Sequence, residues 1–309
     1  MERDTWMQRL EEELRNRMGE EYQITPCIGK DDIPEFGITK QEESIGITIT
    51  LEDCEVKQFD REKDIQPAAM YVQFLYQLKR EMLKNAPGPQ NRFEDVKDHI
   101  IYVLYGRTTN EAALTKIPYE DFLDMLILFR LHYVQGGYQF VRTISNLDLK
   151  SWGVGVKELS DAAKKNTPVL FPPAMIPIDE ANEGTAIKKG ISLEEKISRL
   201  RHESDTAWPM YVLTNEEGKH GATCILYEGL LDQIADIWKT DLIILPSSVD
   251  ETLFLPDLAG EAATWLDTVM DTNRTKELEG KVLSDSVYLY DYKEKQIKLA
   301  ATALAGILS

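Results

Sequence analysis

The strongest candidate for a catalytic nucleophile is Cys224, because His220 stands four residues before it. A thiol becomes reactive when a nearby imidazole withdraws its proton. The apolar residues around Cys224 predict a strand, on which positions 220 and 224 would lie about 13 Å apart, too far for a hydrogen bond. We therefore interpret Cys224 as a small buried thiol, the usual environment of a free cysteine.

A second group of candidates combines two hydroxyls with two carboxylates. Ser247 and Ser248 are followed closely by Asp250 and Glu251. A hydroxyl held beside a carboxylate is a starting point for acyl or phosphoryl chemistry. Serine and aspartate are also common in turns, because their side chains bond to the nearby backbone. The segment therefore predicts a turn, with a divergent hydrolase site as the alternative.

The familiar catalytic and cofactor signatures do not occur in the sequence. There is no phosphate-binding P-loop, dinucleotide-binding glycine turn, H-E-x-x-H zinc helix, G-x-S-x-G elbow or calcium loop. His99, His132 and His202 stand alone in the sequence, because none has a ligand-type residue at position i+4. We therefore assign no cofactor and no metal site from the sequence.

The composition indicates an acidic globular protein. The 309 residues include 53 acidic and 35 basic ones, for a formal charge of -18. Such a surface repels nucleic-acid phosphates and anionic lipids, so we expect neither as a partner unless the protein imitates the charge of DNA. The widely spaced Cys27, Cys54 and Cys224, the absence of a secretory signal and the lack of a membrane-length apolar segment predict a cytoplasmic protein.

Hydrophobic periodicity divides the chain into helices and strands. Helices are predicted at residues 6–18, 66–84, 156–165, 192–200, 230–238 and 258–269. Strands are predicted at residues 36–39, 45–51, 99–105, 138–144, 210–214, 222–227, 242–245, 252–255, 287–290 and 296–300. Residues 122–134 are almost continuously apolar and fit either a buried strand or a buried helix.

Three of these expectations are specific in detail. The helix at 66–84 should bury the side that carries Tyr71, Phe74 and Leu75. The helix at 156–165 should stop before Pro168, because proline lacks the N–H that a helix interior needs. The strands at 210–214 and 222–227 should form a hairpin.

These elements predict an α+β fold in which antiparallel sheets carry helices on one face. The two halves of the chain show a similar order of strands and helices, which is compatible with an internal duplication. We expect an N-terminal half at residues 1–173, a linker at 174–191 and a C-terminal half at 192–309. The linker is placed at 174–191 because proline, glycine and charged residues mix there without periodicity.

Five segments in a fixed order resemble a bacterial family of unknown function. They are Asn166–Pro173, Tyr211–Asn215, Gly221–Tyr227, Leu245–Glu251 and Leu283–Asp291. The resemblance extends over nearly the whole chain and implies membership, without an established activity or site. Many members place a histidine just before the glutamate of the fourth segment, where this chain has Asp250. Chemistry that depends on a histidine in that loop is therefore not expected here.

Two classes of function remain open from the sequence. The missing motifs and the acidic charge favour a non-catalytic interaction or accessory factor, which would bind an unidentified protein at a sheet edge or a cleft. The alternative is a divergent hydrolase that uses Ser247, Ser248 or Cys224 with carboxylates brought together by folding.

Overall fold

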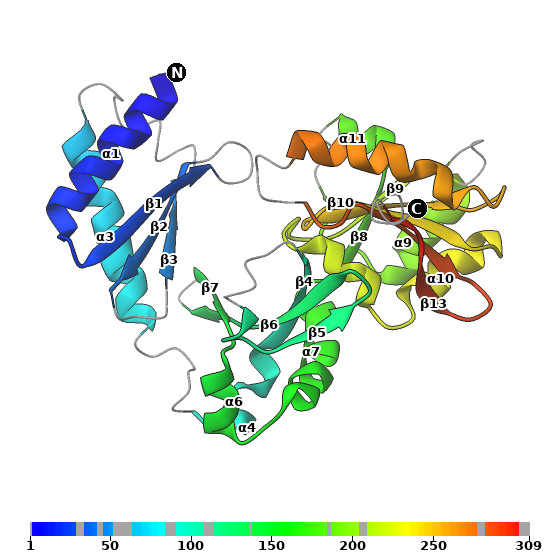
Figure 1. The fold of residues 1–309 in the computed structure, drawn as a ribbon, viewed down its shortest axis with the longest axis horizontal. Coiled ribbons are helices and arrows are strands. Elements are labelled where there is room, and N and C mark those ends of the chain that lie inside the picture. The colour runs from blue at the N-terminus through cyan, green and yellow to red at the C-terminus, as the bar shows by residue number, and fades with distance from the viewer. Residues whose placement is uncertain are drawn as a thin grey trace, which may run out of the picture. The chain divides into compact units, whose positions relative to one another are not determined.

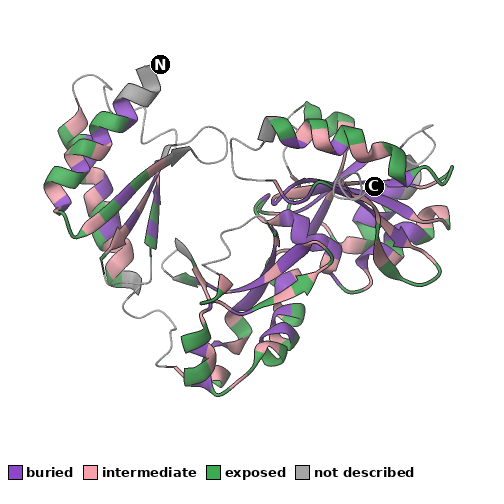
Figure 2. Ribbon diagram, viewed as in Figure 1, coloured by how far each residue is buried: buried purple, intermediate pink, exposed green. Residues whose placement is uncertain are grey.

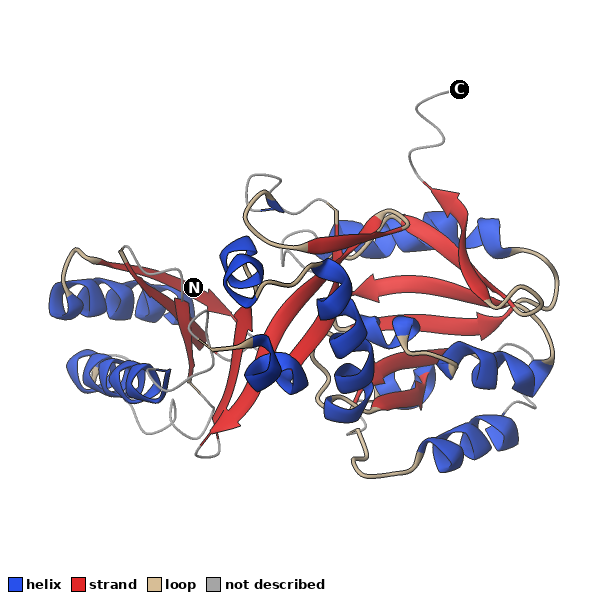
Figure 3. Cartoon of the chain, turned by 90° about the horizontal axis from the view of Figure 1, so that it is seen from below, coloured by secondary structure: helices blue, strands red, loops and turns tan. Residues whose placement is uncertain are grey.

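The chain forms three antiparallel sheets flanked by helices (Figures 1 and 3), which is the α+β class predicted above. This computed structural model describes residues 2–28, 34–41, 46–51, 64–83, 91–107, 114–135, 138–183, 187–203, 209–276 and 282–302. Contacts divide the chain into two compact units. The first contains residues 1–86 and 135–140, and the second contains residues 87–134 and 141–309.

The first unit packs two helices on one face of a small sheet. Its elements are α1 (Glu2–Met18), β1 (Tyr22–Ile28), β2 (Pro34–Lys40), β3 (Gly46–Thr50) and α3 (Ile65–Leu83). The strands pair antiparallel in the order β1-β2-β3. Alternate residues of the strands, such as Ile47 and Ile49, are buried against Trp6 and Leu10 of α1. Gly19 ends α1 with φ +97, a conformation that favours glycine.

Helix α3 lies within one residue of the predicted bounds, and Tyr71 and Leu75 pack on the core as expected, but Phe74 does not. Ala68, Ala69 and Val72 are fully buried, whereas Phe74 is 58% exposed. The prediction for Phe74 was wrong because it rested on hydrophobicity alone, whereas side-chain size also decides which side of a helix is buried. Small residues allow a helix to approach its neighbours closely, and close packing fixes which side faces inward.

The second unit begins with most of a four-stranded sheet, of which residues 135 and 138–140 are grouped with the first unit. After α4 (Phe93–Val96) and η2 (Lys97–His99) come β4 (Ile100–Gly106), β5 (Tyr119–Phe122), β6 (Met125–Gln135) and β7 (Tyr138–Thr143). β6 lies at the centre and pairs with the other three strands. The apolar segment 122–134 is therefore mostly strand, and it is apolar on both faces because both faces are covered.

A six-stranded antiparallel sheet completes the second unit. Its order is β13 (Gln296–Thr302), β12 (Ser286–Asp291), β10 (Leu242–Ser248), β11 (Glu251–Pro256), β9 (Tyr211–Asn215) and β8 (Pro173–Pro177). Ile243 and Leu245 pack under η4 (Ala262–Trp265) and α11 (Leu266–Lys276), while Leu242 and Ile244 face the opposite core. Helix α11 thus adds a cover on the second face, and the central strands are buried (Figure 2).

The end of one helix and the segment after His220 differ from the predicted elements. Helix α7 (Val156–Leu170), which follows α6 (Asn146–Trp152), continues through Pro168, so its predicted end was wrong. Its last turn is held by Thr167, whose hydroxyl donates to Ala163 O at 2.7 Å. Residues 221–226 form the 3-10 helix η3 (Gly221–Leu226) in place of the second hairpin strand, after His220 turns the chain with φ +53.

The segment 174–191 contains secondary structure where we expected a linker. β8 pairs with β9 along its length, and α8 (Ile178–Asn182) follows it directly. The chain continues into α9 (Leu193–Glu203), and α10 (Leu230–Trp238) lies further on. β8 and β9 belong to one sheet, and contacts group both with the second unit, which begins at Pro87.

Candidate functional site

Folding brings His220 and Asp250 together at one end of the six-stranded sheet. The N–H of His220 donates to Oδ1 of Asp250 at 2.8 Å, and the hydroxyl of Thr214 donates to Asp250 O at 2.7 Å. Gly221 fits tightly between these groups, because a Cβ there would collide with the Thr214 hydroxyl and the Asp250 carbonyl. Residues 214–221 and Asp250, which are about 30 residues apart in sequence, therefore meet at this junction.

The two serines of the predicted turn serve the hairpin between β10 and β11. Ser247 donates from its hydroxyl to Oε1 of Glu251 at 3.0 Å. The hydroxyl of Ser248 accepts the N–H of Asp250 at 3.1 Å, where the strand pairing is irregular. Both serines are buried. These contacts are the ones that stabilise a tight turn, which agrees with the first interpretation of this segment.

Cys224 lies fully buried in η3, and its thiol contacts a backbone carbonyl and not a basic side chain of the described residues. Its thiol donates to the backbone O of Thr214 at 3.0 Å, and burial raises its pKa to about 12. A thiol with this pKa is almost wholly protonated at neutral pH and is a poor nucleophile. The strand that we predicted for this segment is absent, but the predicted buried thiol agrees with its environment.

Arg130 and Tyr105, which the sequence analysis did not select, contact His220. Nη1 of Arg130 lies 3.0 Å from Nε2 of His220, and Nη2 donates to the Tyr105 hydroxyl at 2.6 Å. Because a guanidinium only donates, Nε2 must accept, and the neutral imidazole carries its proton on Nδ1. Burial, followed by the charge of Arg130, lowers the pKa of His220 to about 4.

A signal for Arg130 was present in the sequence. It is the one charged residue in the apolar run that forms β6, Met125–Gln135. Its partner His220 is 90 residues away, so their contact could not be inferred from spacing. An isolated arginine inside a buried strand is uncommon, and this feature would have identified Arg130 as a candidate site residue.

The remaining histidines do not gather into a metal site in the described residues. His99 Nδ1 lies 3.2 Å from the backbone O of His132, and the His132 ring packs on Phe171. The side chain of His202 lies outside the described residues. Over the part of the chain that the structure describes, no three His, Cys, Asp or Glu residues form a group that could hold a metal ion.

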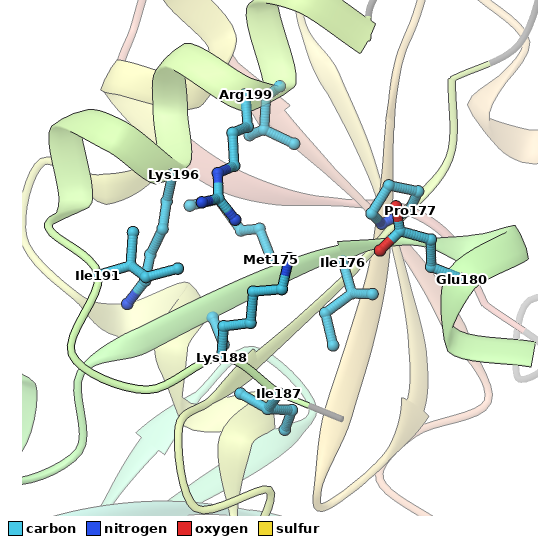
Figure 4. A pocket seen from close by; sticks show the side chains of 11 residues that line it. Met175, Ile176, Pro177, Glu180, Ile187, Lys188, Ile191, Lys196 and Arg199 are labelled. Carbon is cyan, nitrogen blue, oxygen red and sulfur yellow. The ribbon is translucent and has the colours of Figure 1, made fainter. Parts of the chain in front are cut away.

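A groove of about 300 Å³ runs beside the edge strand β8 (Figure 4). One wall is β8, and the others come from α8, residues 187–191 and the first turns of α9. Met175, Ile176 and Ile187 give the groove an apolar lining. The groove therefore combines an apolar surface with the edge of a sheet, which is a common setting for peptide binding.

The register between β8 and β9 leaves backbone groups of Met175 at the open edge. Ile178 N–H donates to Met210 O, and Glu216 N–H donates to Pro172 O. With this pattern, Ala174 and Ile176 bond to β9, while the N–H and C=O of Met175 point away from it. Pro173 and Pro177 have no N–H to offer there, which shortens the usable edge to one residue.

Cationic side chains surround that open edge. Lys188 and Arg199 reach toward Met175 (Figure 4). Arg199 also bonds to Glu195 at 2.7 Å on the surface of α9, whereas Lys188 has no ion pair within the described ranges. Lys196, which is 7% exposed, donates to Pro173 O and to Glu216, so its charge is already compensated. Lys188 is thus the cation of this lining that the described residues leave without an ion pair, while Arg199 is shared with Glu195 and Glu180 adds a carboxylate beside Pro177.

These features define an antiparallel α+β protein with an open sheet edge beside a cationic groove. The chain belongs to a family of unknown function, DUF5688, whose model matches residues 3–292. This finding confirms the resemblance seen in the ordered segments. Neither the curated proteins nor the solved structures contain a significant match to the chain. Among the described helices, none has the length and apolar character required to cross a membrane.

Proposed function

We propose that this protein is a non-catalytic interaction factor of the bacterial cytoplasm that binds a short, extended, acidic segment of a partner protein in the β8 groove. The observation that carries the proposal is the open edge at Met175 beside Lys188 and Arg199. The free thiol of Cys224 supports a reducing compartment.

Backbone pairing sets the conformation of the proposed ligand. An extended peptide alongside β8 can exchange two hydrogen bonds with Met175, as in strand addition at other sheet edges. Pro173 and Pro177 flank this position, so pairing is limited to the central residue. The bound segment is therefore short, and its neighbouring side chains enter the apolar lining formed by Ile176 and Ile187.

Charge sets the chemistry of the proposed ligand. The whole chain has a formal charge of -18, but the groove presents Lys188 and Arg199 around the open edge. A carboxylate on the peptide would bind these cations, while the acidic remainder of the surface repels unsuited anionic partners. Because the contact area is small, we expect weak and reversible binding.

The contacts of the candidate nucleophiles favour binding over the hydrolase alternative. Cys224 donates to a carbonyl oxygen, and its raised pKa keeps it protonated. The accepting nitrogen of His220 is already used by Arg130, so it is not available to take a proton from a serine or cysteine. Ser247 does have a carboxylate partner in Glu251, but it is positioned within a hairpin.

A displayed peptide library, selected on the full chain, tests this proposal. The comparison uses Lys188→Glu and a matched control, Lys157→Glu, which makes the same charge change at an exposed residue of α7 outside the groove lining. We expect selected peptides to contain acidic residues. They should bind Lys188→Glu about tenfold more weakly than they bind the wild type or Lys157→Glu. Failure to enrich acidic peptides, or equal affinity for all three proteins, would refute the proposal.

A further inference from the structure

We infer that Arg130 and Tyr105, with the guanidinium held in place by His220, form a binding site for an oxyanion, either the carboxylate or the phosphoryl group of a small ligand. The site is separate from the β8 groove, since none of these residues lines that groove. The inference is independent of the proposed interaction function.

The first argument is the uncompensated charge of Arg130. This residue is partly buried on β6, in the row that also carries the buried Leu126 and Leu128. Its side-chain partners are the neutral ring of His220 and the hydroxyl of Tyr105. In the described part of the chain, no carboxylate forms an ion pair with it. A partly desolvated cation without a counter-charge is unfavourable, so an anionic ligand would stabilise it.

The second argument is the surplus of hydrogen-bond donors. A guanidinium has five N–H groups, and the contacts with His220 and Tyr105 account for two of them. Nε of Arg130 is buried and has no partner among the described residues. Because the Tyr105 oxygen accepts from Arg130, its own proton remains to be donated. An oxyanion could accept hydrogen bonds from the remaining Nη N–H groups and from the Tyr105 hydroxyl, and its charge would compensate the guanidinium.

The third argument is the fixed position of the guanidinium. Tyr105 lies on β4 and Arg130 on the adjacent β6, so both side chains start from paired strands. His220 is held from the other side by Asp250, which accepts its backbone N–H at 2.8 Å. An arginine whose position is fixed before binding loses less conformational entropy when it binds a carboxylate or phosphate.

The experiment follows the ring resonances of Tyr105 and His220 by NMR while orthophosphate or acetate is added to the full chain at constant ionic strength set by chloride. We compare Arg130→Gln with Arg107→Gln, which removes an exposed arginine paired with Asp121. We expect saturable shifts in the wild type and in Arg107→Gln, with binding about tenfold weaker in Arg130→Gln. The anion that binds more tightly identifies the phosphoryl or the carboxylate source.

Tyr105→Phe keeps the test decisive if Arg130→Gln does not fold. The phenylalanine retains the ring and removes only the hydroxyl, so binding measured by calorimetry should weaken several-fold. If neither anion produces saturable shifts in the wild type, or if binding is unchanged in the variants that fold, the inferred site does not exist.

Discussion

The hydroxyl of Thr167 accepts the backbone N–H of Tyr102 at 3.1 Å and occupies the place where another strand would pair with β4. Thr223 does the same for the N–H of Leu104 at 3.0 Å. Asn166 donates to the carbonyl of Ile100 at 2.9 Å. Side chains from α7 and η3 thus cover the edge of β4 that faces away from β6, which prevents it from pairing with another chain.

Loss of the Thr167 hydroxyl should destabilise the second unit. Thr167→Val keeps the shape of the side chain but leaves the buried N–H of Tyr102 without its partner. We expect the free energy of unfolding to fall by about 1–3 kcal/mol, as is usual for a buried unsatisfied group. Urea denaturation measures this change. Thr167→Ser, which keeps the hydroxyl, should lose less, and an equal loss in both variants would contradict the assigned hydrogen bond.

Gly221 should not tolerate a side chain. Gly221→Ala places a Cβ against the Thr214 hydroxyl and the Asp250 carbonyl, so the junction must open. We expect a loss of about 1–3 kcal/mol in thermal or urea unfolding, typical of an overpacked core position. Gly155→Ala is the control, because its Cβ would meet only the flexible end of Glu158 at 3.3 Å. Similar stability of the two variants would show that the junction is loosely packed.

Lowering the pH should destabilise the protein through His220. Its pKa of about 4 in the folded state lies below the ordinary value of 6.5, so the unfolded chain binds the extra proton first. The contribution of His220 is fully present above pH 6.5 and is lost as the pH falls toward 4. Unfolding free energies measured across this range should fall by up to about 1.4 kcal/mol per pH unit for this one group.

His220→Asn provides the control for this pH dependence, because asparagine tolerates the positive φ of this position. The variant should show a smaller loss of stability between pH 6.5 and 4 than the wild type. An NMR titration of His220 with a midpoint near its ordinary pKa would contradict the buried, neutral imidazole.

Cys224 should resist thiol reagents while the protein is folded. Its thiol is fully buried and its pKa is raised to about 12, so neither access nor thiolate is available. Mass spectrometry of the peptide that contains Cys224 should find little alkylation under native conditions and rapid alkylation in urea. Fast alkylation of Cys224 in the folded protein would contradict this account and support a role for Cys224 as a nucleophile.

Local patterns in the sequence predicted the elements but not the sites. The alternation at Ile47 and Ile49 and the glycine stop at Gly19 are local signals, and the corresponding strand and helix end follow them. Phe74 was misplaced because packing against α1 depends on side-chain size. The contact between Arg130 and His220 joins strand β6 to the turn before η3, 90 residues later, and no short-range pattern encodes such a contact.

The groove was missed for a related reason. Prolines and glycines between residues 172 and 190 are typical of a linker, yet β8 becomes a strand because β9, about 40 residues later, supplies its hydrogen bonds. The cationic side chains of Lys188 and Arg199 line one groove beside β8 in the folded chain. Tertiary pairing therefore creates the site from residues that show no motif.

The most direct test of the proposed binding function replaces Met175 with proline. Met175→Pro removes the outward N–H and leaves the hydrogen bonds from Ala174 and Ile176 to β9 in place. Pro173 and Pro177 already occupy equivalent outward positions of β8, so the strand accommodates proline there. The account predicts a folded protein whose affinity for the selected acidic peptide, measured by calorimetry, falls about tenfold or more. A folded variant that binds this peptide as tightly as the wild type would contradict it.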